Sequence, residues 1–409
     1  MRRPPRVRPL HLLLVGLAVV GCAGSPVLAN PPIVRPSPAP ATATPSSPPD
    51  PLPVVLPHDD APHHRLTEWW YYTGHLVAAD GRRFGFEDVI FRAERGGFPV
   101  TWASHLALTD ERGDQFLYAQ RSEVGPQVDV TGTTGGTGGE FAFSLAGNDP
   151  SAMAASPAPV PASPSGGGPW SMSRTAGTDV LAASAAATEV TVGGAVAGAA
   201  AGPPFSISLS LADAPAVLHG DAGWIDFGPA GGSYYYSRPR MAARGTVTLD
   251  GQAIPVSGSA WFDHQWGDFI SVGGGGWDWF AVNLDDRTDL TLSLVRAADG
   301  SYPLVYGTIV GPDGSVRHLM AEAFSVGVTG HWTSPRTGAI YPAGWRIAIP
   351  SAGLQVTLEP TVAAQELDTR ATTGVTYWEG SQHVSAMRDR AEIGGDAYVE
   401  LTGYAPGES

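Results

Sequence analysis

The fold is decided by an aromatic run near the start of the chain, Glu68-Trp69-Trp70-Tyr71-Tyr72-Thr73-Gly74-His75-Leu76. Aromatic and β-branched residues favour a β-strand, and successive side chains of a strand point to opposite faces. One face would carry Glu68, Trp70 and Tyr72. The other would carry Trp69, Tyr71, Thr73 and His75. Because both faces are aromatic, we predict that one packs a barrel interior and the other packs against a neighbouring domain.

Strand signals continue along the rest of the chain. Further aromatic or β-branched runs, several with strict alternation, are 84–92, 205–211, 245–249 and 290–295. Asp-Gly dipeptides, which favour tight turns, occur at 80–81, 250–251, 299–300 and 313–314. No convincing amphipathic helix of a dozen residues interrupts them. Many short strands separated by such turns predict an antiparallel, all-β barrel or sandwich.

The aromatic run has a counterpart in the second half of the chain. Trp69 to Leu76 aligns with Trp277-Asp278-Trp279-Phe280-Ala281-Val282-Asn283-Leu284, with aromatic residues at three matching positions and leucine at a fourth. The closing strands also correspond, because 235–236 parallels 377–378 and 260–263 parallels 397–400. Matching order at both ends of each half favours duplication over chance. We therefore predict two similar β domains, 58–270 and 271–405, with short strands and loose Gly- and Ala-rich loops at 131–204.

The chain begins with the features of a bacterial lipoprotein signal. A basic lead precedes an apolar run, Leu10 to Val20, that is too short to span a bilayer. Val19-Val20-Gly21-Cys22 then resembles a lipobox, and Cys22 is the only cysteine. We predict a signal peptide at 1–21, lipidation of Cys22 and a disordered Pro/Ala/Ser-rich tether at 22–57. The protein would be exported and held by its acyl chains on the cell membrane or the outer-membrane surface. An ordinary secretory signal with an incidental cysteine is the alternative.

Composition narrows the possible functions. The 409 residues carry a net charge of −15 and no lysine, and an acidic chain without a basic run is a poor partner for nucleic acid. The sequence has neither a Gly-x-Ser-x-Gly nucleophile elbow nor a phosphate-binding motif. His63, His64, His75, His105 and His264 match no common metal-site spacing. We therefore predict no cofactor and no metal, and leave the oligomeric state open.

A series of motifs resembles one family over nearly all of 58–404. The motifs are Glu68 to Leu76, 81–86, Phe91-Arg92, Leu218 to Asp221, Tyr234 to Arg240, Gly258 to Gly267, Gly276 to Phe280, Trp332 to Pro335, Tyr341-Pro342, Tyr377 to Gly380 and Tyr398 to Tyr404. In this order they resemble the AttH-like proteins. These belong with the carotenoid 1,2-hydratases (hydroxyneurosporene synthases) in one lipocalin-like superfamily, and the opening Glu-Trp-Trp-Tyr-Tyr is closer to the AttH-like group of "predicted secreted hydrolases". The resemblance implies two tandem lipocalin-like β-barrels.

Asp263 and His264 are the candidate catalytic residues. A carboxyl flanked by Trp261, Phe262 and Trp266 would have its neutral form favoured by desolvation, which makes it a proton donor. The resemblance to the hydratases implies an acid that protonates an alkene, with aromatic faces stabilising the cation. In a regular strand, however, Asp263 and His264 point to opposite faces. The alternative is that Asp263 caps a turn or pairs with Arg238 or Arg240.

Aromatic and acidic residues of the matching motifs are the candidates for lining a ligand site. They are Glu68, Trp69, Tyr71, His75, Tyr235, Trp261, Trp266, Trp277, Trp279 and Glu379. The alternative for each is plain packing in a core or between domains.

Three functions are compatible with these residues, and we predict the first, with the second as its alternative. The first is a membrane-anchored protein that binds a hydrophobic small molecule, such as a lipid, an isoprenoid or a carotenoid-like compound, in a barrel or at the domain junction. The second is an enzyme that adds water to an isoprenoid double bond, with Asp263 as the acid. The third is an accessory role beside an export system.

Overall fold

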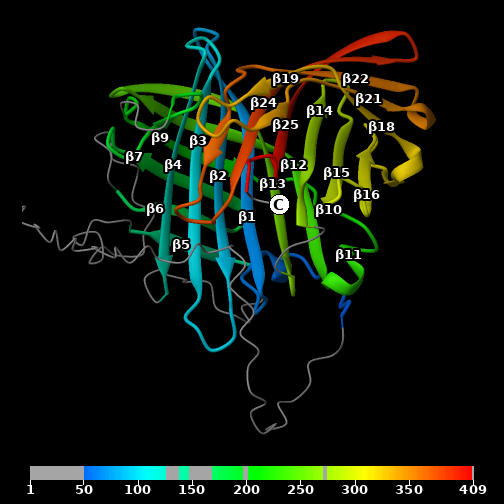
Figure 1. Ribbon diagram of the computed structural model, residues 1–409, viewed down its shortest axis with the longest axis horizontal. Coiled ribbons are helices and arrows are strands. Elements are labelled where there is room, and N and C mark those ends of the chain that lie inside the picture. The colour runs from blue at the N-terminus through cyan, green and yellow to red at the C-terminus, as the bar shows by residue number, and fades with distance from the viewer. Residues whose placement is uncertain (1–49, 126–137, 147–167, 197–200, 270–273, 408–409) are drawn as a thin grey trace, which may run out of the picture.

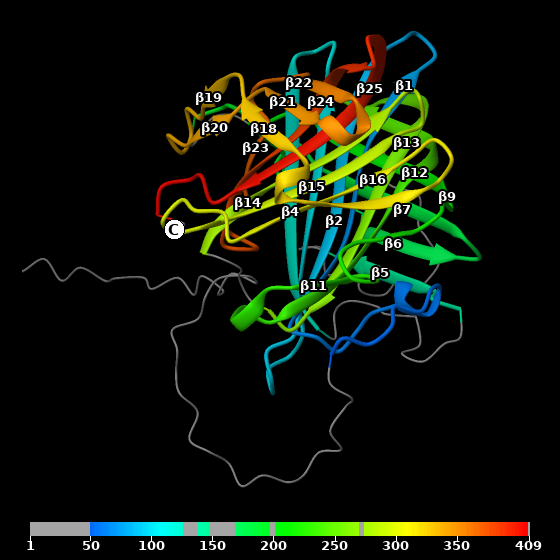
Figure 2. The same cartoon turned by 90° about the vertical axis from the view of Figure 1, so that its right-hand side faces the viewer.

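A computed structural model describes residues 50–125, 138–146, 168–196, 201–269 and 274–407. Two curled antiparallel sheets dominate these ranges, and the second sheet, coloured yellow to red, lies against a face of the first (Figures 1 and 2). Each sheet forms a half-barrel, which confirms the predicted all-β, lipocalin-like architecture. The predicted signal peptide, Cys22 and most of the predicted tether lie outside the described residues.

The first sheet contains 13 strands within the described ranges, in the order β5-β6-β7-β9-β12-β13-β1-β2-β3-β4-β8, with β10 and β11 beside β12. Their bounds are β1 Thr67–Ala78, β2 Arg83–Ala93, β3 Thr101–Asp110, β4 Gln115–Val124, β5 Phe141–Leu145, β6 Trp170–Thr175, β7 Thr178–Ala185, β8 Thr191–Val192, β9 Phe205–Ala212, β10 Val217–Leu218, β11 Trp224–Asp226, β12 Gly232–Leu249 and β13 Gln252–Gly267. Strands β5 to β8 come from the Gly- and Ala-rich stretch, as predicted for its described part.

The second sheet contains ten strands in the described part of the chain, in the order β17-β16-β15-β14-β25-β24-β22-β21-β18, with β23 beside β24. Their bounds are β14 Gly274–Leu284, β15 Asp289–Ala297, β16 Leu304–Val310, β17 Val316–Met320, β18 Ser325–Val328, β21 Trp345–Ile349, β22 Leu354–Pro360, β23 Glu366–Asp368, β24 Thr376–Arg388 and β25 Ala391–Thr402. A small hairpin joins β19 (His331–Thr333) to β20 (Ile340–Pro342).

Short 3-10 turns are the helical elements of the described residues: η1 His58–Asp60, η3 Gly228–Ala230, η4 Ala321–Ala323 and η5 Pro350–Ala352. Within the same ranges, none of these is long or apolar enough to cross a membrane as a helix. The Asp-Gly turns lie where the sequence predicts them, between β1 and β2, β12 and β13, β15 and β16, and β16 and β17. At the β12–β13 turn, Asp250 and Gly251 both have positive φ, as a type I′ hairpin turn requires.

The two sheets share one strand-pairing scheme. In each sheet the first strand pairs on one side with the next strand and on the other with the last: β1 with β2 and β13, and β14 with β15 and β25. Even the register agrees, because Tyr71 lies opposite Asp263 and its repeat counterpart Trp279 lies opposite Glu400. The internal repeat read from the sequence therefore reappears in the pairing of the strands.

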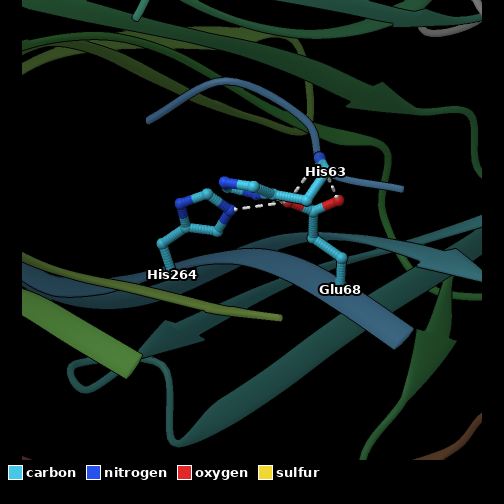
Figure 3. Close-up of side chains that lie close together, drawn as sticks. All are labelled: His63, Glu68 and His264. Carbon is cyan, nitrogen blue, oxygen red and sulfur yellow. Dashed lines mark hydrogen bonds and ion pairs between the residues drawn. The ribbon is translucent and has the colours of Figure 1, made fainter. Parts of the chain in front are cut away.

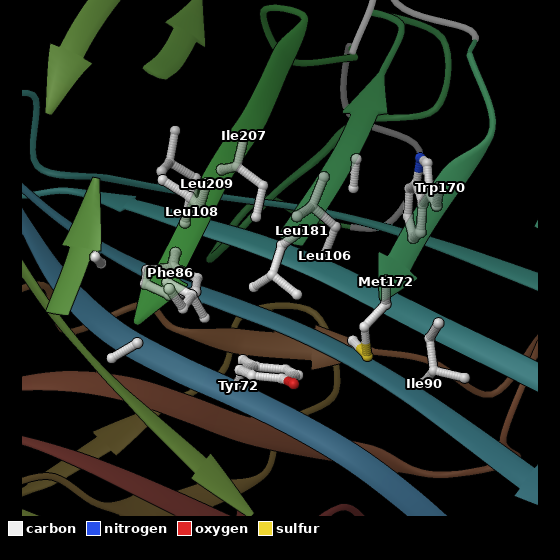
Figure 4. Packing of buried hydrophobic residues seen from close by; sticks show 14 of the residues in the cluster. Tyr72, Phe86, Ile90, Leu106, Leu108, Trp170, Met172, Leu181, Ile207 and Leu209 are labelled. Carbon is white, nitrogen blue, oxygen red and sulfur yellow. The ribbon is translucent and has the colours of Figure 1, made fainter. Parts of the chain in front are cut away.

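The interior of the first sheet is filled with side chains rather than open. Aromatic and aliphatic residues from β1 to β13 pack there, and Figure 4 shows Tyr72, Phe86, Leu106, Trp170 and Leu209 converging from several strands. Full burial of one such side chain contributes roughly 1.5–3 kcal/mol. A calyx-type ligand site in this interior, one of the two places expected from the sequence, is thus occupied by the protein's own core.

The end of the predicted tether packs on the folded body. Asp50 pairs with Arg65 and accepts a hydrogen bond from the Tyr234 hydroxyl, while Val54 and Leu56 pack against the first core. Residues 50–57 therefore adjoin the first sheet, although the sequence places them in a disordered tether.

Candidate functional site

A cavity of about 130 Å³ lies at the junction between the two sheets. Its first-sheet wall includes Trp69, Tyr71, Glu87, Phe91, Tyr235 and Asp263. Its second-sheet wall includes Trp277, Trp279, Ser293, Val295, Tyr306 and Glu400. Phe227 and Phe269 contribute from loops beside β11 and β13. The wall is mostly aromatic.

Strand alternation explains why these side chains meet. Trp70 and Tyr72 belong to the first core, whereas Tyr71 belongs to a separate cluster with Trp261, Trp279 and Tyr398 between the sheets. This confirms the prediction that one face of the aromatic run packs the interior and the other a neighbouring domain. The junction is also polar, because the Tyr71 hydroxyl donates to Glu379 at 2.7 Å.

Asp263 is held in the cavity wall by three donors. The Tyr235 hydroxyl donates to Oδ2 at 2.7 Å, the Trp261 indole N–H to Oδ1 at 2.7 Å, and the Ser237 hydroxyl also to Oδ1. Only 4% of the residue is exposed, and burial raises the pKa of its carboxyl to about 7 despite these donors. Near neutral pH, Asp263 therefore exchanges readily between a proton donor and an acceptor.

Glu400 is the counterpart of Asp263 in the second sheet. It lines the same cavity, where its Oε2 accepts a hydrogen bond from the Trp277 indole at 3.0 Å. Burial raises the pKa of this carboxyl to about 7 as well, and the charge of Asp263 adds to the effect. Two carboxyls that titrate in the same range and repel one another favour a state in which one is neutral and the other ionised.

Two further carboxyls extend this acidic group into the junction. Glu87 accepts from the Tyr377 hydroxyl at 2.7 Å, and Glu379 accepts from Tyr71. Each keeps one buried carboxyl oxygen without a hydrogen-bond partner. Burial, followed by repulsion from neighbouring carboxyls, holds both pKa values well above the usual range. Within the described residues, no arginine contributes to the pKa shift of any of the four carboxyls.

The stability of the fold should therefore depend on these carboxyls through pH. Between about pH 4 and 7 the folded protein keeps protons on Asp263 and Glu400 that the unfolded chain releases, so the free energy of unfolding falls as pH rises. The Asp263→Asn/Glu400→Gln double variant has no carboxyl at either position, so its free energy of unfolding should not fall in this way. Relative to the wild type, its stability should increase from about pH 4 to pH 7 by on the order of 3 kcal/mol per carboxyl. Urea unfolding of both proteins at several pH values measures the difference. A difference that stays constant with pH would contradict the assignment.

His264 does not join Asp263. It lies on the opposite face of β13, where its Nε2 is 3.0 Å from Oε1 of Glu68, and His63 Nδ1 lies 2.7 Å from the same oxygen (Figure 3). Glu68 and His264 are fully buried, and neither lines the cavity. The donor atoms of the three residues lie within 4.8 Å of one another. One carboxylate oxygen thus contacts both imidazoles at hydrogen-bond distances.

The other sequence-predicted residues divide between the cavity and its surroundings. Trp69, Tyr71, Tyr235, Trp277 and Trp279 line the cavity together with Asp263. Trp261 and Glu379 lie behind this wall. The Trp261 indole donates a hydrogen bond to Asp263, and Glu379 accepts one from the Tyr71 hydroxyl. His75 lies at the junction, 3.1 Å from the carbonyl oxygen of Ala397, and Trp266 stacks on His63. The alternative ion pairs of Asp263 do not form, because Arg238 pairs with Asp60 and Arg240 with Asp289.

Several residues of the site escape the sequence analysis. Glu87, Phe91 and Tyr306 reach the cavity from strands whose sequences carry no chemical signal of their own. Glu400 did have a signal, because the internal repeat aligns it with Asp263. A search for the repeat counterpart of each candidate residue would have found it.

The chain is similar to known proteins over most of its length. The AttH-like family matches residues 47–404. A putative AttH from Nitrosomonas europaea, known from its crystal structure, is 26% identical with a TM-score of 0.67, over 88% of this chain and 100% of that one. Kievitone hydratase from Nectria haematococca is 16% identical with a TM-score of 0.55, over 86% of this chain and 93% of that one. No curated protein matches the sequence.

Proposed function

Because the chain belongs to the AttH-like family, we propose that its junction cavity is the active site of a hydratase-type enzyme, which adds water to a carbon–carbon double bond of a small, largely apolar molecule. One observation carries the proposal: two carboxyls with pKa values of about 7 lie in the wall of an aromatic cavity. The shared fold with an enzyme named kievitone hydratase supports the reaction class by analogy only.

The reaction would use the two carboxyls in opposite roles. Neutral Asp263 donates its proton to one alkene carbon, and the electron pair of the double bond forms the new C–H bond. The neighbouring carbon becomes cationic, and the faces of Tyr71, Trp277 and Trp279 stabilise it. A water molecule then forms the C–O bond and releases its extra proton to ionised Glu400. The sum is one water molecule added to one double bond, with no redox change. The catalytic cycle closes when Glu400 releases its proton to solvent and Asp263 takes one up.

The carboxyls favour this chemistry over ligand binding alone. An apolar ligand gains nothing from buried acids, and burying a carboxyl without a cation is costly. Strongly shifted pKa values in a concave site are a mark of catalysis. The second candidate is a binding protein for a lipid, an isoprenoid or a carotenoid-like molecule, which the mostly aromatic wall favours. The two candidate functions differ in one respect: a hydratase converts the molecule that it binds, and a binding protein releases it chemically unchanged.

Turnover can be tested without knowing the substrate. The purified protein is incubated with a bacterial lipid extract in water labelled with heavy oxygen, and the extract is analysed by mass spectrometry. We expect an apolar component to gain one labelled water. Native mass spectrometry on the same sample reports which component is bound. A component that binds at the cavity and never changes in mass would leave the binding protein as the function and overturn the hydratase.

We also propose that Cys22 anchors the protein to a membrane through attached acyl chains, as the lipobox-like sequence indicates. Cys22→Ala should then move the protein from the membrane fraction to the soluble exported fraction, because the variant has no thiol to carry the acyl chains. Cell fractionation with immunoblotting measures this, and mass spectrometry of the wild-type N-terminus should find acyl groups. A variant that stays in the membrane fraction would contradict the anchor.

A further inference from the structure

A chain of hydrogen bonds leads from Asp263 to the protein surface. The Ser237 hydroxyl donates to Asp263, and Ser237 Oγ lies 2.7 Å from Nε2 of His219. On its other side, His219 Nδ1 lies 2.9 Å from Oγ1 of Thr308, which lies 3.3 Å from Nδ1 of His318. Ser237, His219 and Thr308 are buried, whereas His318 is exposed on β17. The chain thus joins a buried carboxyl to solvent through side chains alone.

We propose that Ser237, His219, Thr308 and His318 form a proton relay that returns a proton from solvent to Asp263 after each turnover. The relay rests on the proposed function, since only a reaction that consumes the Asp263 proton needs it. An apolar ligand in the cavity excludes water from the carboxyl, so a second route for the proton becomes necessary.

The chemistry of each link suits the transfer. Hydroxyl groups and a neutral imidazole can each accept one proton while donating another. Burial lowers the pKa of His219 to about 3, so its ring stays neutral and keeps one accepting nitrogen. In one transfer, His318 gives its Nδ1 proton to the Thr308 hydroxyl, and Thr308 gives its hydroxyl proton to Nδ1 of His219. His219 then gives its Nε2 proton to the Ser237 hydroxyl. Ser237 passes its proton to Asp263. One proton enters the relay at His318 and one arrives at Asp263. The neutral ring of His219 changes from the tautomer protonated on Nε2 to the one protonated on Nδ1.

The relay also crosses the junction. Ser237 and His219 belong to the first half of the chain, and Thr308 and His318 belong to β16 and β17 of the second sheet. Proton delivery therefore depends on the docked arrangement of both sheets, which gives a functional reason for a polar bridge at a buried position.

The test measures proton exchange at Asp263 directly, with a saturated hydrocarbon filling the cavity in place of a substrate, so that water is excluded and no turnover competes. After a rapid pH drop through its pKa, time-resolved infrared spectroscopy follows the carboxyl band that Asp263→Asn removes. This subtraction is necessary because Tyr235, Tyr306, Glu379 and Glu400 face Asp263 and also titrate or respond to its charge. Thr308→Val, which keeps the shape and removes the hydroxyl, should slow protonation roughly tenfold or more and leave the equilibrium pKa of Asp263 unchanged. His219→Gln should do the same.

His105→Gln is the matched control. His105 is also buried at the junction with its pKa lowered to about 3, but it bonds to Tyr377 and Thr372 rather than toward Asp263. Its rate of Asp263 protonation should equal that of the wild type. Unchanged rates in both relay variants, or equal slowing in the control, would overturn the relay. Slowed exchange in a protein that shows no turnover would uphold the proton path to Asp263 but refute the hydratase, and with it the use of that path in catalysis.

Discussion

Asp263→Asn is expected to remove turnover while the cavity still takes up its ligand. The amide cannot donate an acidic proton, and loss of a general acid lowers rates by roughly 10²–10⁴-fold. The labelled-water assay measures the loss, and native mass spectrometry of the same sample measures ligand uptake. Full turnover by Asp263→Asn would refute the role of Asp263 as the acid.

The substitution should leave the wall of the cavity in place. The carbonyl oxygen of the introduced amide can still accept from Ser237 and Trp261, as Oδ1 of Asp263 does in the wild type. The Tyr235 hydroxyl, which accepts the Trp279 indole N–H at 3.0 Å, can turn to accept from the NH₂ group of that amide. A fall in turnover would therefore report lost chemistry rather than a collapsed site.

Asp88→Asn provides the matched control for this variant. Asp88 is buried on β2 with its pKa raised to about 8 by burial, so a neutral amide closely replaces its neutral carboxyl. It follows Glu87 in the strand and does not line the cavity. Turnover in Asp88→Asn should match that of the wild type. Equal loss in both variants would show that the assay responds to damaged folding instead of to the acid.

Much of the fold could be predicted from local sequence. Alternation in the aromatic run sets which residues enter the first core and which face the second sheet, and period-two patterning is a local property. The same rule places Asp263 and His264 on opposite faces, so pairing them as one catalytic unit conflicts with their own strand geometry. The repeat is similarly readable, because it needs only the order of motifs.

The sequence names the domain junction as one of two places for a ligand site, but which of the two holds the cavity could not be predicted, because that depends on how the two sheets dock. Tyr306 and Glu87 lie far apart in the sequence and meet only across the junction. Whether a half-barrel is open or filled also depends on the summed volumes of side chains such as Trp70 and Trp170, which no single strand reveals. Glu68 shows the same limit: it reads as a ligand-facing acid but is enclosed by His63 and His264.

Asp60→Ala is expected to cause a large loss of stability although Asp60 lies outside the cavity. Asp60 is fully buried, and its carboxylate contacts the Arg238 guanidinium at 2.8 Å and Arg174 at 2.9 Å. The carboxylate also accepts a hydrogen bond from the Tyr236 hydroxyl. The backbone oxygen of Asp60 accepts a hydrogen bond from the Trp70 indole N–H at 3.0 Å. Removing it leaves two buried cations short of a partner. Breaking a buried pair in this way costs about 3–5 kcal/mol.

The effect follows from position as much as from charge. Asp60 ends η1, so its contacts tie the segment leading out of the tether to β6 and β12 of the first sheet.

Urea unfolding of Asp60→Ala measures the lost free energy. Asp80→Ala, which breaks an exposed pair with Arg112, serves as the control and should change little, because water already screens that pair. Arg174 keeps Asp179, and Arg238 keeps Asp213, so the variant should still fold. A loss no greater than that of the control would mean that these remaining partners satisfy both guanidinium groups and that Asp60 does not anchor the segment.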